Sequence, residues 1–127
     1  MRFSIQREAL LKPLTQVVGV VERRQTMPVL ANVLVEVTNG LLGLTGSDLE
    51  VELSARCAVE DSDNGATTLP ARKLFDIVRA LPDGSRIDLS QSGERVTLKA
   101  GRSRFTLSTL PAAEFPTVDD IDVIERG

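Results

Sequence analysis

The sequence lacks histidine, tryptophan and tyrosine, and its one cysteine is Cys57. Without histidine the chain cannot form a Ser–His–Asp triad or a Cys–His nucleophile, and it has no Cys/His spacing typical of a metal site. A single cysteine excludes an internal disulfide, which is typical of proteins from a reducing compartment. We therefore expect a non-catalytic protein that carries no metal and no cofactor.

Long hydrophobic runs are absent as well. No stretch approaches the roughly 18 apolar residues of a membrane span, and the N-terminus lacks the basic start and apolar core of a signal peptide. The 127 residues fit one domain, which at this size can bury a sufficient core without disulfides or metals. We expect a cytoplasmic domain with no membrane contact.

The net charge of −3 is unevenly distributed along the chain. Residues 114–127 hold five acids and one base, a charge of −4, so residues 1–113 carry +1. Within residues 72–104, eight bases outnumber four acids. A locally basic surface can bind nucleic acid or an acidic protein, but an ordinary solvated surface has the same composition. Charge alone leaves both interpretations open.

Hydrophobic periodicity and turn residues divide the chain into two units with the same order of a strand, a helix and three strands. The first unit is predicted to contain a strand at Arg2–Ile5, a helix at Arg7–Val18, and strands at Val29–Thr38, Leu41–Thr45 and Asp48–Val59. After a polar loop, Glu60–Gly65, the second unit is predicted to contain a strand at Ala66–Leu69, a helix at Ala71–Leu81, and strands at Arg86–Ser90, Arg95–Lys99 and Arg102–Thr109. This order predicts an α+β fold with two helices packed side by side on antiparallel sheets. Pro13 should kink or weaken the first helix.

The last predicted strand is the most informative segment. Its alternation places Arg102 and Arg104 on one face and Phe105 and Leu107 on the other. Pro111 ends regular pairing soon afterwards, and the last strand of a domain often lies at a sheet edge. An edge strand offers unpaired N–H and C=O groups, so another chain can bind it by strand addition.

Two other groups of residues have a chemical interpretation and a structural one. Asp48, Glu50 and Glu52 alternate along a predicted strand, and three carboxylates on one face could bind a cation or supply an acid and a base. The same alternation describes the solvent face of a half-buried strand, which we favour. Cys57 follows Arg56, which could lower the pKa of the thiol, but we expect a buried, unreactive thiol.

Any contact with nucleic acid should involve phosphates. The four phenylalanines fall mostly on apolar faces, so few aromatic side chains are available to stack on bases. Contacts from arginine and lysine to phosphates carry no sequence information. The candidates for such contacts are Lys12, Arg24, Arg72, Lys73 and Arg79.

Seven motifs together resemble the bacterial β sliding clamp family, the processivity subunit of DNA polymerase III. They follow one another in order along nearly the whole chain, and the last two are the most specific. The motifs are Arg2–Ile5, Leu10–Leu14, Pro28–Leu30, Leu44–Glu50, Pro70–Ile77, Gly101–Leu110 and Pro111–Pro116. The resemblance is to the first of three similar domains. It implies that residues 1–118 form this domain and that residues 119–127 begin a linker to an absent second domain.

The resemblance further implies a non-catalytic, dimeric ring that encircles duplex DNA and slides on it. The implied DNA-facing residues are Lys12, Arg24, Arg72 and Arg79. At the implied subunit interface, four cations would meet acidic residues of the second subunit: Lys73, Arg95, Arg102 and Arg104. Phe105 and Leu107 would supply apolar contact there. Clamp-loader and polymerase partners would bind through the other domains. The alternative is a protein–protein adaptor that uses the same edge strand without binding DNA.

Overall fold

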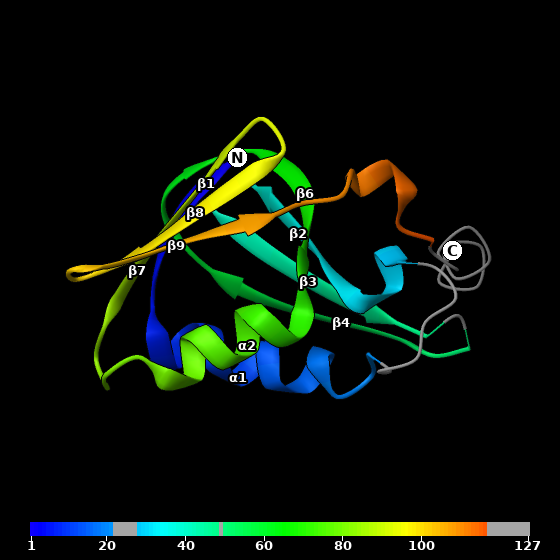
Figure 1. The fold of residues 1–127 in the computed structure, drawn as a ribbon, viewed down its shortest axis with the longest axis horizontal. Helices are drawn as coiled ribbons and strands as arrows, with labels where there is room; N and C mark the ends of the chain where they lie inside the picture. The colour runs from blue at the N-terminus through cyan, green and yellow to red at the C-terminus, as the bar shows by residue number, and fades with distance from the viewer. Residues whose placement is uncertain (22–27, 49, 117–127) are drawn as a thin grey trace.

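The computed structural model describes residues 1–21, 28–48 and 50–116, and Figure 1 shows their arrangement. Its helices are α1 (Arg7–Val18) and α2 (Ala71–Ala80), with short 3-10 helices η1 (Pro28–Ala31) and η2 (Ala112–Glu114). Sheet I has the strand order β5 (Glu60–Asp63), β1 (Arg2–Gln6), β7 (Arg86–Ser92), β8 (Arg95–Ala100), β9 (Ser103–Ser108). Sheet II has the order β4 (Glu52–Ala58), β3 (Leu41–Ser47), β2 (Asn32–Thr38), β6 (Gly65–Pro70). All these pairings are antiparallel, so the predicted α+β fold is confirmed.

The first strand of each unit lies in the sheet of the other unit. β1 pairs with β7, so Phe3 lies opposite Leu89, and β6 pairs with β2, so Leu69 lies opposite Val33. The meanders β2–β3–β4 and β7–β8–β9 follow the predicted order, although β2 starts after η1 and therefore later than predicted. The order of elements does not specify the exchange of first strands. Through this exchange the two units share one hydrophobic core.

The two helices lie side by side against the sheets, as predicted (Figure 1). α1 buries Leu10 and Leu14, and α2 buries Leu74 and Val78. Burying each such side chain contributes about 1.5–3 kcal/mol, and all four join the core shared by both sheets. α1 continues through Pro13, which is itself buried, and ends at the predicted residue. Within the described residues, no helix is long and apolar enough to cross a membrane.

The prediction of a loop at Glu60–Gly65 is wrong except at Asn64, because Glu60–Asp63 form strand β5 and Gly65 begins β6. This segment has no hydrophobic alternation, so its sequence does not indicate a strand. It pairs with β1 at the edge of sheet I. Arg86 lies 3.5 Å from the carboxylate of Glu60 and 2.7 Å from that of Asp61. Backbone pairing and ion pairs, not burial, therefore hold β5 in place.

The predicted strand Asp48–Val59 begins only at Glu52. Before it, the Asp48 carboxylate accepts hydrogen bonds from the N–H groups of Glu50 (3.0 Å) and Val51 (2.6 Å). This is the turn that aspartate forms with the backbone that follows it. The three acids therefore do not share one strand face, and the hypothesis of a carboxylate row is wrong.

Gly46 lies where the end of α1 comes closest to β3. A Cβ atom at this position would lie 2.5 Å from the carbonyl oxygen of Val17. Close-packed interiors have no room for such an overlap, and the neighbouring atom belongs to the helix backbone, which cannot turn aside. Glycine at this position therefore lets α1 pack directly on the strand.

Gly46→Ala is expected to lower the free energy of unfolding by about 2–3 kcal/mol, as in overpacked cores. Urea denaturation followed by circular dichroism measures the change. Gly43→Ala on the same strand is the matched control, because the atom nearest to its new Cβ, the Glu36 carbonyl oxygen, would lie 3.9 Å away. Equal losses of stability in the two variants would contradict close packing as the cause.

Candidate nucleic-acid and subunit interfaces

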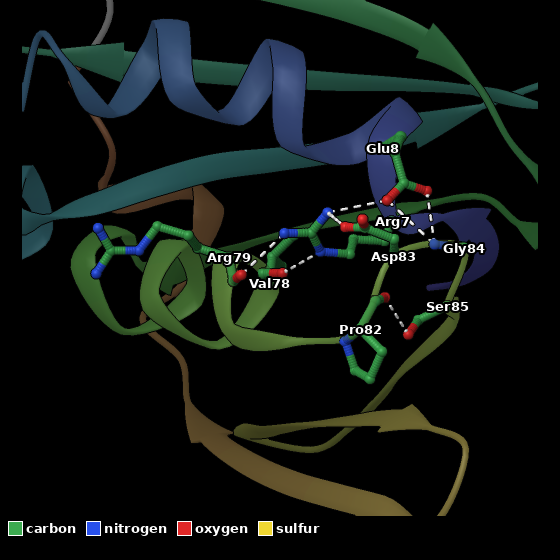
Figure 2. Close-up of polar contacts among 8 residues, drawn as sticks. All are labelled: Arg7, Glu8, Val78, Arg79, Pro82, Asp83, Gly84 and Ser85. Atoms are coloured by element: carbon green, nitrogen blue, oxygen red, sulfur yellow. Dashed lines mark hydrogen bonds and ion pairs between the residues drawn. The ribbon is translucent and has the colours of Figure 1, made fainter.

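Arg7 joins the first turn of α1 to the last turn of α2 (Figure 2). Its guanidinium donates hydrogen bonds to the carbonyl oxygens of Val78 (3.0 Å) and Arg79 (2.8 Å). Carbonyls in the last turn of a helix cannot all be satisfied by helical hydrogen bonds. The Arg7 side chain is only 11% exposed, and its charge faces the negative end of the α2 dipole. Arg7 therefore holds the two helix ends together.

Two carboxylates complete the cluster around Arg7 (Figure 2). Glu8 and Asp83 accept hydrogen bonds from Arg7 Nη1 at 2.9 and 3.1 Å, and Glu8 also accepts from the N–H of Gly84. The hydrogen bond from Arg7, followed by that from Gly84, holds the pKa of Glu8 below its ordinary value. The sequence alone does not identify Arg7 as a link between the helices, because Val78 lies 71 positions away in the chain.

α2 presents basic side chains to solvent. Because its apolar stripe faces the core, Arg72, Lys73, Asp76 and Arg79 are exposed. Arg79 lies 3.5 Å from the carboxylate of Asp76 and stacks over the ring of Phe75, 5.3 Å from its centroid. No described residue forms an ion pair with Arg72 or Lys73. These two cations are therefore available to an external anion.

Lys12 and Arg24, the other predicted DNA-facing residues, belong to α1 and the segment after it. Lys12 is exposed on α1 and forms no ion pair with a described residue. Arg24 lies outside the described residues and stays a prediction. Because α1 and α2 lie side by side, Lys12 and the cations of α2 belong to one layer of two adjacent helices (Figure 1).

β9 forms an edge of sheet I, as the sequence predicts. Arg104 is exposed on this strand, whereas Arg102 lies in the turn before it, so the predicted strand start is one residue early. Phe105 is half-buried, and Leu107, only 4% exposed, belongs to the core. The side chain of Leu107 therefore faces inward, and only its backbone could contribute to strand addition.

Further cations lie beside this edge on β8. Arg95 is exposed at the start of β8, and Lys99 lies between Asp88 on β7 and Arg104 on β9. In the described part of the chain, no ion pair engages Arg95, Lys99, Arg102 or Arg104. Like charges directly opposite on a sheet repel one another, so this corner favours an acidic neighbour from another chain. Lys99 is not among the residues predicted from the sequence, although period-two alternation from Arg95 places it on the same strand face.

Beyond β9 the chain crosses to sheet II (Figure 1). The carbonyl oxygen of Leu110 accepts hydrogen bonds from the N–H (3.1 Å) and the hydroxyl (2.8 Å) of Thr68 on β6. Phe115 is buried with Val29 and Leu34 in a small second core. This segment covers part of the β6 edge, whereas no described strand pairs with the outer edge of β9.

The remaining candidate, Cys57, has the properties of an unreactive thiol, as expected. It is half-buried, and burial raises the pKa of the thiol, whereas reactive thiols have a lowered pKa. Among the residues that the structure describes, no group of three His, Cys, Asp or Glu side chains could hold a metal ion.

Known proteins resemble this chain along almost its whole length. A family model described as the N-terminal domain of the DNA polymerase III beta subunit matches residues 1–119. A beta sliding clamp from Pseudomonas aeruginosa is 60% identical over 121 residues, and one from Escherichia coli K12 is 55% identical over 121 residues. Both matches cover 94% of this chain and 33% of the relative. The chain therefore spans about a third of the length of these relatives.

Solved structures are similar to the same extent. A sliding clamp (DNA polymerase III subunit beta) from Pseudomonas aeruginosa bound to griselimycin aligns with a TM-score of 0.91 at 60% identity, over 94% of this chain and 32% of that one. The pol III beta of Caulobacter crescentus aligns with a TM-score of 0.90 at 42% identity, over 93% of this chain and 32% of that one.

Proposed function

Because the chain belongs to the DNA polymerase III beta subunit family, we propose that it is the N-terminal domain of a sliding clamp. Such a clamp is a ring that encircles duplex DNA and keeps the replicative polymerase attached to it. The observation that carries the proposal is the match over residues 1–119, with a TM-score of 0.91 at 60% identity to a solved clamp. The ring, its DNA and its partners are proposed for a full-length subunit carrying this domain.

The helix layer supports a DNA contact that is independent of sequence. Lys12 and Arg72 are exposed and form no ion pair within the described residues, and Arg79 is exposed as well. With Arg24, they would contact phosphates, which position a protein on DNA without reading its sequence. A closed ring holds DNA by enclosure, so these contacts can remain weak enough for sliding.

The edge of sheet I supports contact with a second subunit. β9 has an open edge, and its exposed Arg104 lies close in sequence to the exposed Arg102. With Arg95 and Lys73, they would meet acidic residues of the second subunit, while Phe105 would add apolar contact beside the backbone of Leu107. Strand addition of this kind combines backbone hydrogen bonds with specific side-chain contacts.

We assign no catalytic step to this domain. The clamp loader and the DNA polymerases would bind the subunit outside residues 1–118, and residues 119–127 would begin the linker to those parts. The subunit would act on chromosomal DNA in the cytoplasm.

A full-length subunit carrying this domain is expected to remain on nicked circular DNA after loading and to leave the same DNA once it is linearised. A ring slides off an open end, whereas direct binding to phosphates is equal on both substrates. Gel filtration of labelled subunit with each DNA measures the retention. Equal retention on the two DNAs would contradict the proposal, and no retention on either would favour the adaptor alternative.

A further inference from the structure

The described residues cover the solvent face of sheet II only in part. At one end, Phe115 and Leu110 pack over Leu34. At the other end lies an open hollow of about 390 Å³, within the size range of ligand sites. It is lined by Glu36, Thr38, Asn39, Leu41, Gly43 and Arg56.

Gly43 lines this hollow and contributes no side chain to it. Glycine inside a strand weakens the strand, and it usually marks a bulge, a bend, or a place where a ligand or another backbone comes close. The pairing of β3 runs through Gly43 in regular register, and its φ angle is not positive. Among the described residues, the atom nearest to a Cβ at this position would be the Glu36 carbonyl oxygen, 3.9 Å away. Neither the backbone nor the packing of this domain therefore requires glycine here, which favours an external group.

Opposite charges stand on the two sides of Gly43. The β-sheet register places Glu36 of β2 directly beside it on one side and Arg56 of β4 directly beside it on the other. The backbones of strands two apart are separated by about 9.6 Å. No ion pair engages either side chain within the described residues. Leu41, on the same face of β3, is 49% exposed.

We propose that this hollow binds an extended peptide segment of a protein partner, with a basic residue against Glu36 and an acidic residue three positions away against Arg56. A polyproline II segment repeats its face every third residue, at about 9.3 Å, which matches the spacing of the two strands that carry these charges. Its backbone lies over Gly43, and an apolar residue between the charged ones contacts Leu41. The site lies on sheet II, apart from the β9 edge, so the proposal does not depend on ring formation.

The test is a nuclear magnetic resonance titration of the ¹⁵N-labelled chain with the synthetic peptide acetyl-Pro-Lys-Pro-Leu-Glu-Pro-amide. The expected result is saturable shifts of the Gly43, Leu41 and Arg56 amides, with a dissociation constant of about 1 mM or lower. The same peptide with glutamine in place of both charged residues should bind about fivefold more weakly, because two exposed ion pairs are lost.

Two variants of the chain test the geometry. Gly43→Leu fills the hollow and should abolish the shifts, whereas Thr106→Leu, which adds the same side chain on the exposed face of β9, should leave them unchanged. Glu36→Lys places cations on both sides and should switch the preference to acetyl-Pro-Glu-Pro-Leu-Glu-Pro-amide. The ¹⁵N spectrum of each variant shows whether the fold is retained.

The proposal is overturned if the peptide causes no saturable shifts at this face, or if the glutamine peptide binds equally well. It is also overturned if folded Gly43→Leu still binds, or if Glu36→Lys does not switch the preference. Shifts of the same amides caused by a DNA duplex instead of the peptide would assign the face to a nucleic acid and would equally reject it.

Discussion

Reversing the charges of Arg102 and Arg104 to glutamate is expected to weaken the dimer of a full-length subunit carrying this domain by about 100-fold or more. Both cations are exposed at the open edge of sheet I, and neither has an ion-pair partner among the described residues. If they face acidic residues of a second subunit, reversal replaces attraction with repulsion at the centre of the junction. Repulsion between like charges across an interface costs several kcal/mol.

Sedimentation velocity over a range of subunit concentrations measures this effect. The matched control is the double reversal of Lys12 and Arg72 to glutamate, which changes the net charge equally but on the helix layer. The control is expected to remain dimeric and to lose affinity for DNA. An unchanged dimer in the Arg102/Arg104 variant would show that β9 is not the strand that meets the second subunit.

Arg7→Ala is expected to lower the free energy of unfolding by about 2–4 kcal/mol. Hydrogen bonds to charged groups contribute about 1.5–3 kcal/mol, and the partly buried carbonyl of Val78 would lose its donor as well. The substitution removes the donors to Val78 and Arg79 and leaves Glu8 and Asp83 without the cation between them. The loss should far exceed that of an ordinary surface substitution.

Urea denaturation of the chain measures the loss, and Arg7→Lys is the informative companion variant. Lysine keeps the charge near the end of α2 but lacks the planar fork that reaches two carbonyls, so it should restore less than half of the stability. Lys12→Ala, an exposed change on the same helix, serves as the control and should be nearly neutral. A loss below about 1 kcal/mol for Arg7→Ala would contradict its role in holding the helices.

The two helices and the two meanders could be predicted because their signals are local. Leu10 and Leu14 on α1, and Leu74 and Val78 on α2, repeat at helical spacing, and the structure buries all four. The alternation around Phe105 likewise identified the edge strand and its exposed face. In each case a periodic pattern within a few residues determines which side is buried.

The features that could not be predicted depend on residues far apart in the sequence. β5 has no apolar alternation and becomes a strand because β1 has a free edge for it. In the sequence, Arg7 is an ordinary residue of the first turn of α1. A cation at that end interacts unfavourably with the dipole of its own helix. Its hydrogen bonds to the end of α2 form only in the folded domain, where that helix end lies beside it. Asp48 was misplaced because its hydrogen bonds to the following backbone compete with strand pairing.

The exchange of β1 and β6 between the sheets bears on how the chain folds during synthesis. When the ribosome has released β1 to β5, their later pairing partners have not yet been synthesised: β7 for β1, and β6 for β2. Neither half of the domain can close its sheet before the other has emerged, so early products expose apolar strand faces. Folding should therefore be a late, all-or-none event. For the same reason, two fragments separated between β5 and β6 should reassociate without a covalent link, because each fragment supplies the strand that the other lacks.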